Sequence, residues 1–442
     1  MKKDIILSNG IRLVCHHLPN LHSVTISISF RAGRVFETEN TAGISHLIEH
    51  LFFRQLDDLS YRDLSSATYR IGSEMRGSTY GDMVTFRITV VPRFFLEAFR
   101  IITRVLHEFD WSADMVEQEK RIVLNQIKFD TESYEAWLNR VYYNGTVFAE
   151  SNMGTYDSVK YLTPIQVNNF KHEYFCPANS FITIIGAYTD DEFASAREIL
   201  EHLPALGTAK KNKIVKPIHF ADRNIHNRWS VFDAEGTTSD ICFCFDVTRD
   251  CDYETARLLS CMLGSGYASL LNYRLSEQTA LTDEVYCDIY SFYGFHRINI
   301  RYSIENADLK RSAVILEETL NMLKQKIENE WYEHNIVFYT DNFLKDYDDT
   351  QFLSDDYIFS DFALDGAVAS EPKQCMEKYK SITLQELSET ARKIFTSENT
   401  SVIIETSLDE QEVIERIEPA ISLLNETLDL RQHRTIQGAR LA

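Results

Sequence analysis

Two histidines and a glutamate stand within five residues, in the run His46-Leu47-Ile48-Glu49-His50. Residues three and four positions apart on a helix lie on one face, so the two imidazoles and the carboxylate would lie together. Two neutral imidazoles one turn apart can hold a zinc ion, and a neighbouring carboxylate can take a proton from a water molecule on that ion. The order H-x-x-E-H is the reverse of the commoner H-E-x-x-H motif and predicts an inverted zinc-binding motif.

The residues around this motif predict that it lies on a helix. Residues 40–45 are typical of a loop with capping residues that leads into a helix. Leu47, Ile48, Leu51 and Phe52 would give that helix an apolar side. Three fixed residues also occur by chance, in roughly a few chains in a hundred of this length. The motif by itself therefore leaves open a helix that merely exposes two histidines.

The run 41–53 resembles the active-site helix of the insulinase-like (pitrilysin) metallopeptidases, and the small bacterial and mitochondrial-processing-peptidase branch is the closest in size. Residues 7–14 are similar to the opening hairpin of that family, and residues 31–37 to the strand end before its active-site loop. Residues 162–186 resemble the end of its first half, and weaker similarity continues to about residue 400. The resemblance implies two related domains that face each other like half a clamshell.

The resemblance also implies a third zinc ligand, a glutamate on a later helix in a pattern like E-x-E-x-x-V-I-x-x-E. In this chain Gln126 stands at the ligand position, and Glu119 stands at the position of an outer partner of the site. An amide carbonyl is a neutral oxygen donor and a poorer zinc ligand than a carboxylate. We therefore expect Zn²⁺ to be bound by His46 and His50, with Gln126 as a weak third ligand.

One alternative third ligand, Asp130, stays open at this point, and so does a site that holds no metal. Asp130 lies one turn after Gln126 and would reach a metal only if the helix shifted. Glu119 lies two turns before Gln126, about 10 Å along the helix axis, which is too far for a simple replacement. Alternatively, Gln126 packs beside an empty site, because two histidines alone do not make a closed zinc site.

A second departure from the family lies in the second half of the chain. The family carries an arginine and a tyrosine seven residues apart, in a segment resembling S-R-L-F-x-x-L-R-E-x-x-G-L-A-Y, and they hold the substrate and help to stabilise the tetrahedral intermediate. The matching positions here hold Ser276 and Asp283. An ionised aspartate cannot donate a hydrogen bond to a developing oxyanion. This chain alone is therefore expected to lack that part of the active site.

Some members of the family divide the active site between two chains. The resemblance thus implies a zinc metalloendopeptidase subunit that cleaves peptides, with leader or precursor peptides as a plausible substrate. Glu49 would be the catalytic general base. A homologous chain in a heterodimer would supply the arginine and tyrosine, with a homodimer as the alternative. The competing hypothesis is a non-catalytic scaffold subunit of a peptidase heterodimer, which Gln126, Ser276 and Asp283 favour.

Residues 72–85 resemble the edge strand that follows the zinc helix in the family, where a peptide adds as an extra strand. The asparagine–alanine step of the family falls on Arg76 and Gly77, and its following threonine on Thr79. An exposed edge offers unpaired N–H and C=O groups to a peptide backbone. We expect Arg76, Gly77 and Thr79 to bind substrate; the alternative is an ordinary edge strand blunted by Arg76.

Composition limits the partners and the location. A formal net charge of −21 argues against a nucleic-acid partner, because a phosphate backbone requires a basic surface. No apolar run has the length of a membrane span, and no signal peptide follows Met1. The eight cysteines fit neither a zinc ribbon nor a disulfide framework, and they predict buried thiols in a reducing cytoplasm.

Hydrophobic patterning predicts an α+β fold made of two related domains. Val24, Ile26, Ile28 and Phe30 alternate with polar residues, which predicts a half-buried strand. Similar patterns recur through both halves, and the periodicity is lost near residues 203–228. We predict an N-terminal domain at 1–205, a linker at 206–228 and a C-terminal domain of the same fold at 229–442. Each domain would be an antiparallel sheet backed by helices.

Overall fold

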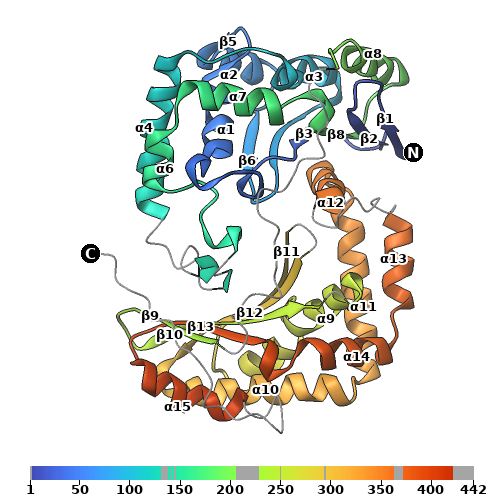
Figure 1. The fold of residues 1–442 in the computed structure, drawn as a ribbon. Coiled ribbons are helices and arrows are strands. Elements are labelled where there is room, and N and C mark those ends of the chain that lie inside the picture. The colour runs from blue at the N-terminus through green and yellow to red at the C-terminus, as the bar shows by residue number, and fades with distance from the viewer. Residues whose placement is uncertain are drawn as a thin grey trace. The chain divides into compact units, whose positions relative to one another are not determined.

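The computed structural model describes residues 2–130, 138–140, 142–143, 146–205, 228–248, 250–292, 295–362 and 372–421 (Figure 1). The chain forms two compact units. The first is Met1–Ala136, Gly145–His219 and Lys345–Ala369; the second is Trp137–Asn144, Phe220–Leu344 and Ser370–Ala442. The predicted linker lies outside the described residues except for Arg228, and the predicted domain boundaries stay a prediction.

A six-stranded sheet organises the first unit. Its strand order is β1 (Lys2–Ile6), β2 (Arg12–His17), β8 (Ser180–Gly186), β3 (Val24–Phe30), β7 (Val84–Val90) and β6 (Arg76–Thr79). The first two strands form the predicted hairpin, in which Gly10 adopts a φ of 90° that favours glycine. At the other end, β6 is an edge strand that pairs only with β7 among the described residues.

Helices cover both faces of this sheet. α1 (Ile44–Arg54) and α3 (Phe95–Ile102) pack on its apolar face, where Phe52 of α1 meets Phe86 of β7 with ring centroids 4.9 Å apart. α12 (Thr350–Phe362) packs on the opposite face, along β3 and β8. The other helices of this unit are α2 (Tyr61–Arg70), α4 (Ala113–Asp130), α6 (Tyr156–Tyr161), α7 (Pro164–Tyr174) and α8 (Asp190–Glu201). Within the described residues, no helix combines the length and the apolar character needed to span a bilayer.

The expectation that β3 is half-buried is wrong, because every residue of the strand is buried. The polar side chains of β3 lie beneath α12 and form hydrogen bonds with the hydroxyl groups of that helix. The Oγ1 atoms of Thr25 and Thr350 are 2.8 Å apart, and so are the Oγ atoms of Ser27 and Ser354. A buried polar face is stable when its groups satisfy one another, and these hydroxyl pairs do so.

The second unit repeats this plan with five strands in the order β11 (Tyr286–Phe292), β12 (Phe295–Glu305), β10 (Thr238–Val247), β13 (Thr400–Thr406) and β9 (Arg228–Asp233). Its helices are α9 (Tyr253–Gly264), α10 (Leu309–Gln325), α11 (Asn329–Asp346), α13 (Pro372–Ser381), α14 (Leu384–Ile394) and α15 (Glu410–Ile421). The predicted α+β class is confirmed. Both sheets are mixed rather than wholly antiparallel, because β2 pairs with β8, and β13 with β9, in parallel. Long connections permit parallel pairing, whereas a hairpin does not.

Candidate metal centre

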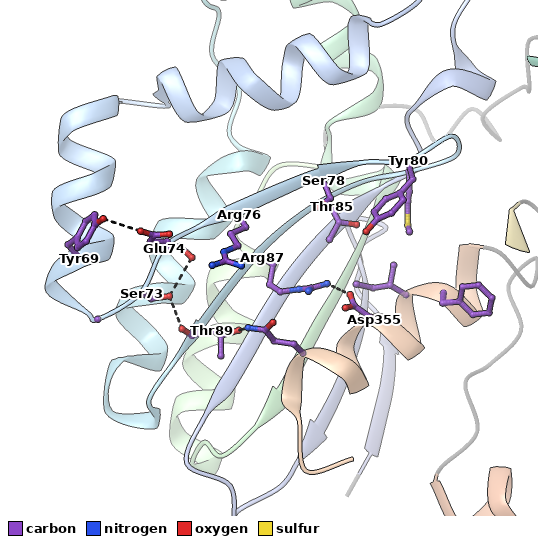
Figure 2. A pocket seen from close by; sticks show the side chains of 15 residues that line it. Tyr69, Ser73, Glu74, Arg76, Ser78, Tyr80, Thr85, Arg87, Thr89 and Asp355 are labelled. Carbon is purple, nitrogen blue, oxygen red and sulfur yellow. Dashed lines mark hydrogen bonds and ion pairs between the residues drawn. The ribbon is translucent and has the colours of Figure 1, made fainter. Parts of the chain in front are cut away.

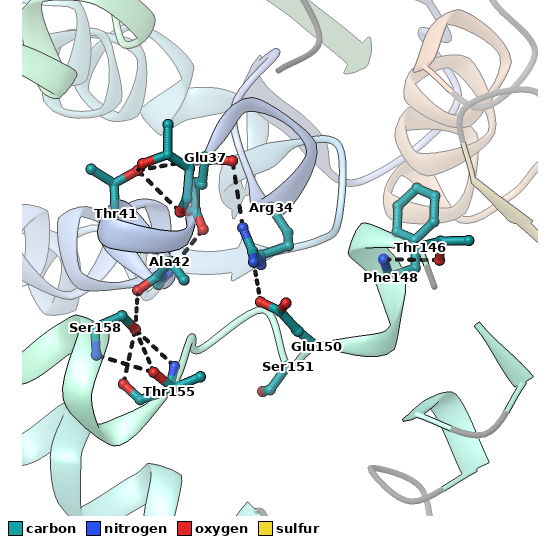
Figure 3. Close-up of polar contacts among 12 residues, drawn as sticks. Arg34, Glu37, Thr41, Ala42, Thr146, Phe148, Glu150, Ser151, Thr155 and Ser158 are labelled. Carbon is teal, nitrogen blue, oxygen red and sulfur yellow. Dashed lines mark hydrogen bonds and ion pairs between the residues drawn. The ribbon is translucent and has the colours of Figure 1, made fainter. Parts of the chain in front are cut away.

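The helix that carries the histidine motif begins at Ile44, directly after Gly43. Its N-terminus is capped by Glu37 rather than by a side chain of residues 40–45. The Glu37 carboxylate accepts hydrogen bonds from the backbone N–H groups of Gly43 (2.8 Å) and Ser45 (2.9 Å), as Figure 3 shows in part. Burial raises the pKa of Glu37, whereas these bonds favour the charged form. A carboxylate at this end also complements the helix dipole.

Neighbouring loops fix the start of α1 in place. The backbone of Gly43 has a φ of 87°, and a Cβ there would lie 2.2 Å from the carbonyl oxygen of Met153. The hydroxyl of Ser158 donates to the carbonyl of Ala42 at 2.8 Å (Figure 3). Buried Arg34 forms an ion pair with Glu150. The helix is therefore held at its first turn, immediately before His46.

The second histidine of the motif is oriented by α4. His50 Nδ1 lies 3.0 Å from Glu119 Oε1, and Arg54 Nε donates to Glu119 Oε2 at 2.5 Å. Burial raises the pKa of Glu119, but the bonds from His50 and Arg54 outweigh burial and keep the pKa below its usual range. An ionised Glu119 holds the Nδ1 proton of His50, which leaves Nε2 as the nitrogen that could bind a metal ion.

His46 lies one turn earlier on α1, with its ring centroid 4.6 Å from that of His50. Its Nδ1 atom is buried and has no hydrogen-bond partner. Burial, together with the charge of His50, lowers the pKa of His46 to about 3. The imidazole is therefore neutral around pH 7, the state in which histidine binds a metal ion.

Gln126 lies on α4 toward the end of α1 that carries His46. The two helices are antiparallel: Trp111, before α4, donates from Nε1 to the carbonyl of Gln55, after α1, at 3.0 Å. Near the other end of α4, Lys128 lies 5.7 Å from the ring centre of Tyr156 in α6. The same helix, α6, contacts the start of α1, because Ser158 donates a hydrogen bond to the carbonyl of Ala42. Like His46 Nδ1, Gln126 Oε1 is buried without a hydrogen-bond partner.

These donors fit a zinc ion. A buried polar atom without a partner costs about 1–3 kcal/mol, and an imidazole nitrogen and an amide oxygen are both atoms that can bind a metal ion. Within the described residues, no group of three or more His, Cys, Asp or Glu side chains could hold a metal. A metal here would therefore use an amide oxygen beside two imidazoles, with a further position open for water. Asp130 ends α4, and its side chain lies outside the described part of the chain.

The side chain of Glu49 projects from α1 toward the edge strand β6. Thr79 Oγ1 donates to Glu49 Oε2 at 2.9 Å. Burial raises the pKa of Glu49 despite this bond and the charge of His50. A Cβ at Gly77 would lie 2.4 Å from Glu49 Oε1 and 2.8 Å from the ring of Phe53, so only a glycine lets β6 approach α1 this closely.

The three residues expected to bind substrate lie on β6 but project from opposite faces of the strand. Gly77 and Thr79 face Glu49, whereas Arg76 points to the other side of β6. There it lines a cavity of about 880 Å³ between the β6–β7 hairpin and α12 (Figure 2). Sequence reasoning also missed Arg87 in this cavity and Glu37 at the helix cap. The two-residue period of a strand places Arg87 on the side opposite to buried Phe86 and Ile88, but no pattern indicated the cap.

The second unit holds the positions at which the family carries arginine and tyrosine. Ser276 lies in a π-helical turn, Asn272–Glu277, and its hydroxyl donates to the carbonyl oxygen of Asp283 at 3.2 Å. The hydroxyl is thus engaged within its own segment. Neither side chain carries the guanidinium or phenol group that the family has at these positions.

The sequence pattern described as "Insulinase (Peptidase family M16)" matches residues 12–155, and that described as "Peptidase M16 inactive domain" matches residues 161–334. A protein of Bacillus subtilis named uncharacterized zinc protease YmxG is 22% identical over 332 residues, which cover 74% of this chain and 79% of that protein. An uncharacterized zinc protease of Rickettsia bellii is 20% identical over 406 residues, which cover 90% of this chain and 96% of the relative.

The crystal structure of a protease from Helicobacter pylori shares the fold. Its TM-score is 0.78 at 15% identity, and the match covers 92% of this chain and 99% of that chain. A putative M16-like peptidase from Alicyclobacillus acidocaldarius has a TM-score of 0.76 at 16% identity, with 92% and 98% covered. With both family patterns matched in order along most of its length, the chain belongs to the insulinase family of peptidases, family M16.

Proposed function

We propose that the chain is a zinc metalloendopeptidase subunit that cleaves peptides, with leader or precursor peptides as plausible substrates. His46, His50 and Gln126 would hold Zn²⁺. The observation that supports this most is the pair of buried, unpartnered atoms, His46 Nδ1 and Gln126 Oε1, beside a His50 ring oriented by Glu119. Zinc is also named for the relatives in Bacillus subtilis and Rickettsia bellii.

Glu49 is the general base in this proposal. When bound, zinc would acidify a water molecule and polarise the carbonyl of the peptide bond. Glu49 takes the proton of the attacking water and later delivers it to the leaving amine. The Thr79 hydroxyl holds one carboxylate oxygen in place.

The edge of β6 would bind the substrate backbone. One side of this strand pairs with β7, and the other has no strand partner among the described residues. A peptide added to that side gains main-chain hydrogen bonds without regard to its side chains. Gly77 and Thr79 place this edge directly beside Glu49.

A partner chain of the same family would supply the missing oxyanion donors. Ser276 and Asp283 support this part of the proposal, because neither replaces an arginine or a tyrosine. A relative in Arabidopsis thaliana is named as a probable subunit beta of the mitochondrial-processing peptidase, and it is 20% identical over 190 residues, or 42% of this chain and 36% of that protein. We propose a heterodimer in the cytoplasm, with a homodimer as the alternative that a solution mass would reveal.

A non-catalytic scaffold subunit is the second candidate, which the replacements at Gln126, Ser276 and Asp283 favour. Glu49→Gln separates the two functions. In a zinc peptidase this variant keeps its zinc and loses peptide cleavage when assayed with the homologous partner chain. If the wild-type chain adds no cleavage to that partner, or if Glu49→Gln cleaves at the full rate, the catalytic proposal fails.

A further inference from the structure

The edge strand β6 presents two chemically different faces. Side chains alternate between the faces of a strand. Gly77 and Thr79 lie toward Glu49 on α1. Arg76 and Ser78 lie toward the cavity on the α12 side of the sheet (Figure 2).

The cavity behind β6 is built entirely from the first unit and has a volume of about 880 Å³. Strands β6 and β7 form its floor, α12 forms one wall, and the segment after α2 forms another. Its polar lining includes Tyr69, Glu74, Arg76, Thr85, Arg87 and Asp355. It is therefore a polar recess directly beside an unpaired strand edge.

Among the described residues, Arg76 is the cationic side chain of this recess that has no ion pair. Arg87 forms an ion pair with Asp355, and the Tyr69 hydroxyl donates to Glu74 at 3.0 Å (Figure 2). Within the described residues, Arg76 has no carboxylate within 4.0 Å. Burial lowers the pKa of Arg87, Tyr80 and Asp349 act against burial, and the positive charge of Arg76 acts with it. Arg87 thus already has acidic neighbours, and a carboxylate that enters the recess would pair with Arg76.

Strand geometry decides which residues of a bound peptide reach the recess. Residues directly opposite each other on paired strands project to the same face, with Cβ atoms about 4.5–5.5 Å apart. Residues of a peptide opposite Arg76 and Ser78 would thus enter the recess. The residue opposite Gly77 would project toward Glu49.

We propose that this recess selects carboxylate side chains at alternate positions of an extended peptide, with Arg76 as the residue that binds them. The inference rests on the proposed peptide ligand and adds its chemistry: aspartate or glutamate on the face turned away from the reacting bond. Arginine pairs with a carboxylate through two parallel hydrogen bonds, which gives geometric specificity as well as attraction. The recess is partly open to solvent, so we expect a gain of about tenfold in affinity rather than more.

Isomeric peptides of identical charge test this proposal. The Glu49→Gln protein is titrated into two fluorescent nonapeptides, one alternating Thr and Glu and the other with the same residues but all Glu clustered at one end. Long-range repulsion by the acidic chain is equal for both. The alternating peptide should bind about tenfold more tightly, and Arg76→Gln should remove the difference. Arg70→Gln alters an exposed arginine at the end of α2, and it should leave the difference in affinity unchanged.

Other outcomes overturn the proposal. The proposal fails if the two isomeric peptides bind with equal affinity, or if the preference survives Arg76→Gln. It also fails if an alternating Thr–Lys peptide binds more tightly, or if no peptide binds. A dimer that Arg76→Gln converts to monomer in light scattering would assign the edge to a second copy and overturn the proposal as well. Cleavage and zinc content of the wild-type chain are measured in parallel. Cleavage without an acidic preference removes only this inference, whereas an acidic preference without zinc or cleavage removes only the proposed function.

Discussion

His50 Nδ1 and Glu119 Oε1 lie 3.0 Å apart and join the helix of the histidine motif to α4. This contact sets the tautomer of one proposed zinc ligand, and Arg54 holds the same carboxylate from the next turn of α1. The carboxylate therefore both orients His50 and keeps its negative charge beside the proposed metal. Such outer partners of a zinc ligand contribute substantially to metal affinity.

Glu119→Ala should weaken zinc binding by about 10- to 100-fold, the range seen when such partners are removed. Competition with a chelator of known affinity measures the change. Glu117→Ala is the control, because that carboxylate is exposed on the same helix and pairs with Lys120. An unchanged zinc affinity in a folded Glu119→Ala protein would show that Glu119 has no role at the metal.

Gln126→Glu should raise zinc affinity and peptide cleavage together, because a carboxylate replaces a neutral oxygen donor. Asn125→Asp adds the same charge to an exposed neighbouring position on α4 and should change neither. The paired measurements are chelator competition and turnover of a fluorogenic peptide with the partner chain. No gain in either would mean that Gln126 does not face the metal.

Gly77→Ala should retain zinc but reduce cleavage by about a hundredfold, since the new Cβ would displace either Glu49 or the substrate edge by a fraction of an ångström or more. Ser66→Ala, at an exposed position of α2, should leave the rate nearly unchanged. Turnover rate and zinc content are read from the same samples. Full activity in Gly77→Ala would place the reacting bond elsewhere.

Glu317→Gln should stabilise the protein more at pH 8 than at pH 5. Burial raises the pKa of Glu317 on α10 from 4.5 to about 7, although Asn321 donates a hydrogen bond to it. Between these values the folded state holds a proton that the unfolded state has lost, so stability falls as pH rises and the loss is complete above pH 7. Urea midpoints at both pH values measure the effect, with exposed Glu328→Gln as the control. Equal gains in stability at both pH values would contradict this prediction.

Local patterns predicted the elements whose partners are close in sequence. The helix at His46 follows from the spacing of the histidine motif and of the apolar residues beside it. The burial of β3 did not follow, because its cover, α12, comes about 320 residues later. A long-range contact of this kind leaves no periodic signal in the strand that it covers.

The residues of the candidate site also divide into those that short-range spacing predicted and those that it did not. Spacing on one helix grouped His46, Glu49 and His50, whereas the placement of Gln126 and Glu119 came from a resemblance. The cap by Glu37 could not be predicted, because it acts across a turn rather than at the helix start. The opposite directions of Arg76 and Gly77 follow from the two-residue period of a strand.

The zinc content of the purified wild-type chain, compared with that of His46→Ala, tests the central claim most directly. After equilibration with micromolar zinc and gel filtration, we predict nearly one zinc ion per wild-type chain and almost none in the variant. Folding of both proteins is compared by circular dichroism. A wild-type chain that carries no zinc, or a folded His46→Ala variant that carries as much, would contradict a metal centre at His46 and His50.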